Sequence, residues 1–124
     1  MRTVLAAALV AVPLFAASPA AAEAPSALVL TLTAPDGATT ATTLVCGGIG
    51  SGHPNTAVAC EQLGKVGGRF EALNVNPDAI CTLEYLPHVA TASGIWEGRR
   101  VAWSKTFGNR CELLSTTGSV FDFS

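Results

Sequence analysis

The side chains most often used in catalysis are few in this chain of 124 residues. Its two histidines, His53 and His88, each stand next to a proline, where a helix start or a strand end is more typical than a catalytic base. Serines are common, but none lies in the G-x-S-x-G context that exposes a nucleophile. The nine acidic residues are scattered, and none is marked out as half of a carboxylate pair. The sequence therefore predicts a protein that is not an enzyme and needs no cofactor.

The cysteines allow a second kind of chemistry, either metal binding or disulfide formation. There are four of them, at Cys46, Cys60, Cys81 and Cys111. No two have C-x-x-C spacing and both histidines are isolated, so a zinc site is disfavoured. All four cysteines follow an N-terminal segment typical of exported proteins, and an even number of cysteines in an exported chain indicates two disulfides. Three pairings are possible, and the simplest is the sequential one, whose loops would stabilise the fold by roughly 3 and 3.7 kcal/mol.

The segment 74–88, which contains "ICTLEYLP", is the candidate for binding another molecule. Two X-Pro pairs bracket it, and the residue before a proline favours extended backbone. Thr82 is β-branched and also prefers extended geometry, while a disulfide at Cys81 would fix the segment just before Leu83. Leu83 is therefore either a core residue or an apolar side chain presented to a protease cleft, which binds an extended segment as an added strand. The pattern leaves both interpretations open.

A presented leucine would make the segment a substrate-like inhibitor. Burying a leucine stabilises a complex by roughly 1.5–3 kcal/mol, and a stiff loop has little conformational entropy to lose on binding. If the Leu83–Glu84 bond were cut, the cross-linked ends would stay close, so resealing would compete with release. The alternative function is a secreted binding module without inhibitory activity, since loops on a rigid scaffold serve binding in general.

The N-terminal residues have the layout of a secretory signal peptide. Arg2 is followed by an apolar run over residues 4–15 and then by small residues up to Ala22. A retained membrane anchor is disfavoured because a transmembrane helix needs about 20 apolar residues. We expect cleavage after Ala22, with cleavage after Ala20 as the second choice. The division is then a signal peptide at residues 1–22 and one secreted, extracellular domain at residues 23–124.

The charge of the exported part is mild. Loss of Arg2 leaves six basic and nine acidic residues, a formal net charge of −3. A nucleic-acid or anionic-membrane partner would require a basic face. The composition therefore predicts neither nucleic acid nor membrane as a partner.

Alternation of apolar and polar residues predicts the strands that support the candidate loop. Five are expected, at residues 27–33, 40–46, 89–92, 95–107 and 120–123. A turn at Pro35-Asp36-Gly37 joins the first two. The third and fourth form a hairpin around Ser93-Gly94, with a bulge at Gly98.

Two helices complete the predicted fold. One begins at Pro54, since proline suits the first helical position. A short one begins at Asn109, where Glu112 stands three residues on, as in a capping box. Because helices and strands do not alternate as parallel units would, the fold class is α+β. We expect a five-stranded antiparallel sheet with two helices packed on it and two disulfides.

Several stretches in order resemble the Streptomyces subtilisin inhibitor family of secreted serine protease inhibitors. The resemblance covers nearly the whole exported domain, in "APSALVLT", "SGHPNTAVAC", "VGGRFEAL", "ICTLEYLP", "GIWEGRRVAWSKTF", "NRCELL" and "GSVF". The resemblance implies an α+β fold with a five-stranded antiparallel sheet and two helices, and a homodimer. It also implies the pairs Cys46–Cys60 and Cys81–Cys111.

The same resemblance implies where the protease binds. The scissile bond maps two residues past the third cysteine, on Leu83–Glu84, and the binding residues are Cys81, Thr82, Leu83, Glu84 and Tyr85. An apolar Leu83 suits subtilisin-like and chymotrypsin-like proteases, whereas trypsin-like enzymes take Lys or Arg. The implied function is a protease inhibitor with subtilisin-like enzymes as partners.

Two residues of the loop depart from the family pattern. The family often has proline where Thr82 stands and a small apolar residue where Glu84 stands, which bears on the strength and spectrum of inhibition. "TLEY" is also similar to the binding loop of potato type I inhibitors, an unrelated fold, where a threonine and an acid hydrogen-bond to arginines. We hypothesise such bonds from Thr82 and Glu84, each worth about 1.5–3 kcal/mol, to one of three arginines: Arg69, Arg99 or Arg100.

Overall fold

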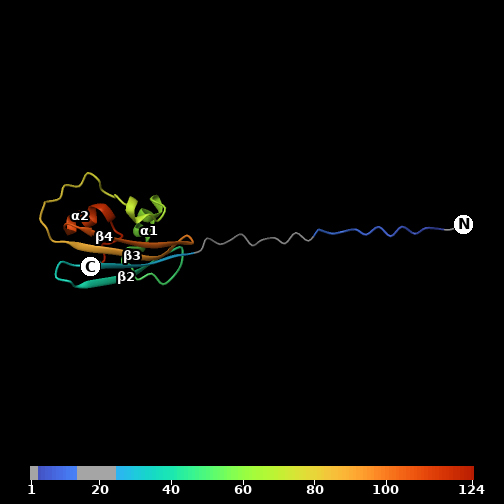
Figure 1. The fold of residues 1–124 in the computed structure, drawn as a ribbon, viewed down its shortest axis with the longest axis horizontal. Helices are drawn as coiled ribbons and strands as arrows, with labels where there is room; N and C mark the ends of the chain where they lie inside the picture. The colour runs from blue at the N-terminus through green and yellow to red at the C-terminus, as the bar shows by residue number, and fades with distance from the viewer. Residues whose placement is uncertain (1–2, 14–24) are drawn as a thin grey trace.

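The computed structural model describes residues 3–13 and 25–124 (Figure 1). Residues 3–13 are exposed and form neither helix nor strand. None of the helices in the described part of the chain has the length and apolar character needed to span a bilayer. The predicted cleavage site after Ala22 lies outside the described residues.

Four antiparallel strands form one sheet in the spatial order β2-β1-β3-β4. They are β1 (Ser26–Thr33), β2 (Thr39–Cys46), β3 (His88–Trp96) and β4 (Arg99–Phe107). β1 lies inside the sheet, with Leu30 opposite Thr42 of β2 and Ala92 of β3. The predicted turn between the first two strands is confirmed, and Gly37 supplies its positive φ of 86°.

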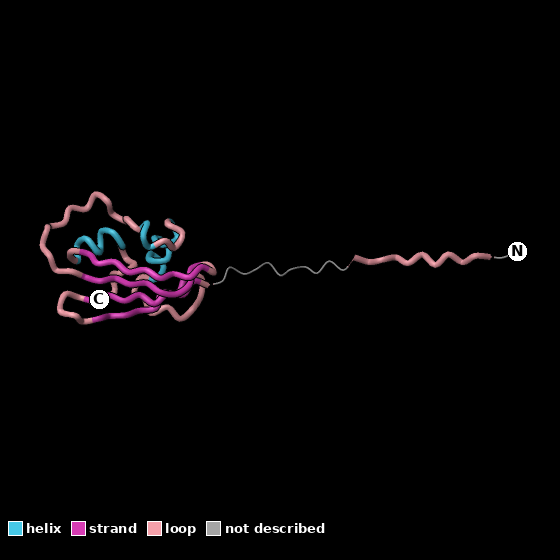
Figure 2. Tube along the Cα trace, viewed as in Figure 1, coloured by secondary structure: helices cyan, strands magenta, loops and turns pink. Residues whose placement is uncertain are grey.

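The helices lie on one face of the sheet (Figures 1 and 2). They are α1 (Thr56–Lys65) and α2 (Arg110–Thr117), and the short 3-10 helix η1 (Phe70–Ala72) lies between them in the sequence. β1 alternates buried and more exposed residues as predicted. Its buried side chains form the core together with those of the helices: Leu28, Leu30, Leu32, Ala59, Leu63 and Leu113. The other face of the sheet is not covered by a helix.

The predicted fifth strand at residues 120–123 is wrong, because the sheet has four strands. After α2 the chain makes two successive turns, in which the N–H groups of Val120 and Asp122 each donate to the carbonyl three residues back at 3.2 Å. Val120 and Phe121 are neighbours, yet both are fully buried, whereas neighbouring side chains of a strand point to opposite faces. The segment therefore fills the core as a turn, and its apolar pattern only resembles that of a strand.

The turn of the β3–β4 hairpin also lies elsewhere than predicted. It is at Glu97–Gly98 and not at Ser93–Gly94. Glu97 and Gly98 have positive φ angles of 45° and 81°, and two such residues form the tight turn that matches the twist of the strands. Gly94 lies inside β3, where a Cβ would collide with the carbonyl of Ala27 in β1. The glycine thus allows the strands to approach, and the bulge predicted at Gly98 is wrong.

Both predicted helices are present. α1 begins at Thr56, two residues after Pro54. α2 begins as predicted, because the side-chain oxygen of Asn109 accepts a hydrogen bond from the Glu112 N–H at 2.9 Å. The Glu112 carboxylate in turn accepts from the Gly108 N–H at 3.0 Å, which extends this cap by one residue.

The sequential disulfide pairing is confirmed. Cys46 is bonded to Cys60 and ties the end of β2 to α1, while Cys81 is bonded to Cys111 in the first turn of α2. The described residues contain no group of three or more His, Cys, Asp or Glu side chains that could hold a metal ion. All four cysteines are therefore structural cross-links.

Candidate functional site

Residues 74–87 belong to the longest stretch without helix or strand between residues 25 and 124, which runs over residues 73–87 and connects η1 to β3 (Figures 1 and 2). Backbone hydrogen bonds hold both ends. The N–H groups of Val75 and Asn76 donate to carbonyls in the last turn of α2 at 3.0 and 2.8 Å. The N–H of Leu86 donates to the carbonyl that directly follows β4, at 2.8 Å. The stretch, called the exposed loop below, is thus attached at its start to α2 and at its end to β4.

The middle of the exposed loop presents apolar side chains to solvent. The Cys81–Cys111 disulfide joins it to α2, and Leu83 lies two residues further on. The Leu83 side chain is 96% exposed, Ile80 is 97% exposed and Tyr85 is 74% exposed. Leu83 is therefore not a core residue. Three large apolar side chains exposed within six residues indicate a surface that another molecule covers.

One asparagine holds the backbone on both sides of Leu83. Nδ2 of Asn109 donates to the carbonyl of Thr82 and to the carbonyl of Glu84, both at 2.9 Å. Asn109 is only 6% exposed, so the donor of these part-buried hydrogen bonds is shielded from water, although Thr82 and Glu84 are exposed residues. Its amide oxygen caps α2 at the same time. The residues before and after Leu83 are thus fixed to the rigid body, and the Leu83 side chain projects outward between them.

Sequence reasoning identified Asn109 only as a helix cap. The cysteine pairing could have indicated its contact with the loop, because Asn109 stands two residues before Cys111 and Thr82 directly follows Cys81. Once Cys81 is paired with Cys111, the residues flanking the two cysteines must be close. A polar side chain at the start of α2 is then within reach of the loop carbonyls that follow Cys81.

The hypothesised arginine bonds are not formed. Arg69, Arg99 and Arg100 line a common cavity near the turn end of the β3–β4 hairpin, whereas the exposed loop enters β3 at the opposite end. Between residues 25 and 124, the side chains of Thr82 and Glu84 have neither a hydrogen-bond partner nor an ion-pair partner. The structure holds the loop through the backbone carbonyls of these two residues, and the asparagine replaces the arginines.

The two histidines have structural contacts. His53 is buried, its Nε2 donates to the carbonyl of Val120 at 3.0 Å, and its Nδ1 accepts from the Asn55 N–H at 2.9 Å. It therefore joins the start of α1 to the C-terminal turn. His88 opens β3, and its Nδ1 lies 2.8 Å from the Leu86 carbonyl. Neither position resembles a catalytic base beside a nucleophile.

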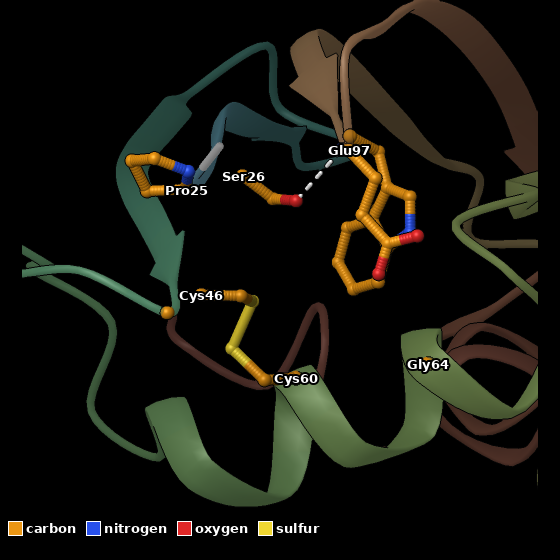
Figure 3. A pocket seen from close by; sticks show the side chains of 8 residues that line it. Pro25, Ser26, Cys46, Cys60, Gly64 and Glu97 are labelled. Atoms are coloured by element: carbon orange, nitrogen blue, oxygen red, sulfur yellow. Dashed lines mark hydrogen bonds between the residues drawn. A yellow bond between two sulfur atoms is a disulfide. The ribbon is translucent and has the colours of Figure 1, made fainter. Parts of the chain in front are cut away.

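A cavity of about 330 Å³ lies beside the Cys46–Cys60 disulfide (Figure 3). It is at the end of the sheet opposite to the exposed loop, where the start of β1 meets the end of β3. The Glu97 N–H donates to the Ser26 hydroxyl at 2.9 Å across its rim. Glu97 is the single ionisable side chain among the lining residues. The cavity thus lacks the convergent polar groups of an active site.

Comparison with known proteins relates most of the chain to one family. A family model described as subtilisin inhibitor-like matches residues 24–109. Subtilisin inhibitor-like protein 4 of Streptomyces lavendulae is 47% identical over 113 residues, which cover 86% of this chain and 97% of that protein. Protease inhibitor SIL-V5 of Streptomyces luteoverticillatus is 46% identical over 107 residues, which cover 81% of this chain and 99% of that protein.

A solved structure has a similar fold. It is the crystal structure of Streptomyces caespitosus sermetstatin in complex with Bacillus licheniformis subtilisin. The TM-score is 0.63 and the sequence identity 32%, and the match covers 81% of this chain and 100% of that chain.

Proposed function

The chain belongs to the subtilisin inhibitor-like family, and on this premise we propose that it inhibits subtilisin-like serine proteases with Leu83–Glu84 as its reactive bond. Membership of a family of inhibitors confirms that the protein is not an enzyme. One observation carries the proposal: Leu83 is 96% exposed on a loop whose backbone is held on both sides by a buried asparagine.

The exposed loop has the properties that a protease cleft requires. A cleft binds an extended segment as an added strand and buries one side chain in its main pocket. Burying Leu83 would stabilise the complex by roughly 1.5–3 kcal/mol. Ile80 and Tyr85 are also exposed and can make further apolar contacts on either side. Because the loop is already fixed, binding costs little conformational entropy.

The attachments of the loop account for inhibition in place of digestion. If the protease cuts Leu83–Glu84, the disulfide holds the first fragment at Cys81, and the Asn109 amide still bonds to one carbonyl of each fragment, those of Thr82 and Glu84. The new amino group therefore stays near the acyl carbon, and resealing is faster than release. Closely held reactants of this kind reach very high effective concentrations.

The apolar character of Leu83 defines the range of target proteases. A leucine fits the large apolar pockets of subtilisin-like and chymotrypsin-like enzymes. It lacks the positive charge that an aspartate at the bottom of a trypsin-like pocket requires. We therefore propose chymotrypsin-like proteases as further partners and expect weak inhibition of trypsin-like ones.

We also propose that two copies associate through the uncovered face of the sheet. The helices cover only the opposite face (Figure 2). On the uncovered face Val29 is 47% exposed and Ile95 is 50% exposed, and both are in central strands. Their strand neighbours on this face include Ala27, Ser93 and Ala102, which are small enough for close packing. The exposed Val29 and Ile95 side chains could pack against a second copy, since an isologous dimer buries the same patch twice.

Residues 1–22 are proposed to direct secretion and to be removed. The support is the charged start, the apolar run and the small residues before Ala22. The exported product would be a single inhibitor domain of residues 23–124 in an oxidising compartment, where both disulfides persist. Determination of the N-terminal sequence of the protein recovered from a culture medium tests this.

Titration of subtilisin with the purified domain tests the function. We expect stoichiometric loss of activity towards a small chromogenic peptide. Catalytic amounts of subtilisin at mildly acid pH should produce one slow nick at Leu83–Glu84, with fragments that separate only after reduction of Cys81–Cys111. Rapid cleavage at many sites without loss of subtilisin activity would contradict the proposal.

A matched pair of variants identifies the reactive residue. Leu83→Ala should weaken inhibition roughly 10- to 150-fold, because the lost burial is worth about 1.5–3 kcal/mol. Ile49 is an equally exposed aliphatic residue, 97% accessible, beside the other disulfide. Ile49→Ala should leave the inhibition constant unchanged. Equal effects of the two substitutions would show that Leu83 is not the residue in the main pocket.

A further inference from the structure

Glu84 places a negative charge directly after the reactive residue, and its own chain does not neutralise it. The side chain is exposed. Between residues 25 and 124 there are two ion pairs, Lys65–Glu61 at 3.7 Å and Arg110–Asp122 at 3.3 Å, and neither involves Glu84. Its carboxylate has no hydrogen-bond donor within the described part of the chain.

The exposed loop supplies no cation of its own for Glu84. Residues 74–87 contain Asp78 and Glu84 but no lysine or arginine. Arg110 stands beside the cross-linked Cys111, but its guanidinium donates to the Asp122 carboxylate at 3.3 Å and to the Ser124 hydroxyl at 2.9 Å. Both charged side chains of residues 74–87 are therefore acidic, and they stand among exposed apolar side chains.

The Glu84 backbone is fixed, so the direction in which its side chain leaves the loop is fixed as well. The Asn109 amide holds the Glu84 carbonyl at 2.9 Å, and the Leu86 N–H is bonded two residues later. In a complex made through Leu83, the Glu84 side chain must enter the protease subsite on the leaving-group side of the scissile bond. Its Cβ cannot move away without breaking the contacts that fix the backbone of the loop.

We propose that the Glu84 carboxylate selects among serine proteases for those with a lysine or arginine in the subsite next to the scissile bond. This rests on the proposed function, since it assumes that Leu83 occupies the main pocket. An unpaired charge that loses its water on binding is costly, and a like charge across the interface costs more. A lysine or arginine at that subsite attracts the Glu84 carboxylate and so offsets the free-energy cost of removing its water. Glu84 therefore favours one group of partners and rejects the others.

The change in affinity that we expect depends on how far the pair between Glu84 and the subsite cation is exposed to water. A charge pair at the rim of an interface changes affinity by about 2- to 5-fold and is screened by salt. A pair that the complex shields from water, with a charge-assisted hydrogen bond, changes it by about 10- to 150-fold. We expect a value of about 10-fold at low salt, because the subsite is only partly closed.

A double-mutant cycle tests the proposal. The inhibitors are the unchanged domain and Glu84→Gln, which keeps the shape and removes the charge. The proteases are a subtilisin with a neutral residue in the subsite beside the scissile bond and the same enzyme with a lysine introduced there. We expect the lysine to strengthen inhibition by the unchanged domain about 10-fold more than inhibition by Glu84→Gln. The difference should shrink at 1 M salt, where the screening length is about 3 Å.

Asp78→Asn is the matched control, because Asp78 is the other acid of the loop and lies before the cross-linked cysteine. It should respond to the lysine as the unchanged domain does. If the unchanged domain and Glu84→Gln gain equally from the lysine, the inference is overturned while the proposed function stands. If Asp78→Asn loses the gain as fully as Glu84→Gln, the effect is one of net charge, and the specific role of Glu84 is overturned. If neither inhibitor acts on either enzyme, the proposed function fails together with the inference.

Discussion

The substitution Asn109→Ser isolates the two hydrogen bonds that fix the exposed loop. Serine is as good a helix cap as asparagine, so α2 keeps its start. The shorter side chain cannot reach the carbonyls of Thr82 and Glu84, which lie 2.9 Å from the asparagine nitrogen. Each neutral hydrogen bond contributes about 0.5–1.5 kcal/mol. Loss of both hydrogen bonds should therefore lower the free energy that holds the loop in its ordered conformation by about 1–3 kcal/mol.

Binding to the protease must restore that order, so the loss appears in the inhibition constant. At about 1.4 kcal/mol for each tenfold change, we expect inhibition of subtilisin to weaken roughly 5- to 150-fold. The variant should also be cut faster at Leu83–Glu84, because its fragments are held less closely. Residual subtilisin activity measured over hours, together with the mass of the reduced fragments, gives both quantities.

A general loss of stability must be separated from a loss at the loop. Leu63 is fully buried in α1, and Leu63→Ala should cost about 2–5 kcal/mol of unfolding free energy through the cavity it leaves. It should nevertheless inhibit subtilisin as well as the unchanged domain does at temperatures where it is folded. If Asn109→Ser inhibits as strongly as the unchanged domain, or Leu63→Ala is weakened as much as Asn109→Ser, the reasoning is refuted.

Two further substitutions test the target range and the dimer. Leu83→Lys should shift inhibition from subtilisin towards trypsin, because the introduced ammonium can pair with the aspartate of the trypsin pocket. Inhibition constants for trypsin and subtilisin measure this shift. If neither constant changes, Leu83 is not the reactive residue. Val29→Glu places a charge on the uncovered face of the sheet and should convert a dimer to a monomer, because burying two unpaired carboxylates is costly. Sedimentation equilibrium detects the halved mass, and an unchanged dimer would locate the interface elsewhere.

Patterns that depend on neighbouring residues predicted the structure correctly. β1 alternates because every second residue is buried, among them its three leucines, and a single strand shows this pattern without its partners. The start of α2 depends on Asn109 and Glu112, three residues apart, so the cap was also visible. Both features arise from contacts within one element.

Three features that depend on distant contacts were predicted wrongly or missed, although both disulfides were predicted correctly. Residues 120–123 have an apolar pattern typical of a strand, but their conformation is set by the burial of both Val120 and Phe121 in the core between the sheet and the helices. Gly94 looked like a turn residue, whereas its role is close approach to β1, sixty-odd residues earlier in the chain. The Asn109 contacts with the loop span 25 and 27 residues and required the disulfide partner to be known.

The double role of Asn109 has a consequence for how the molecule fluctuates. The same amide caps α2 through its oxygen and holds the loop through its nitrogen. Fraying of the first turn of α2 would therefore release the loop, and a loosened loop would free the cap. Helix end and loop thus form one cooperative unit of local unfolding. A protease that engages the loop is consequently expected to protect the first amides of α2 from exchange with solvent.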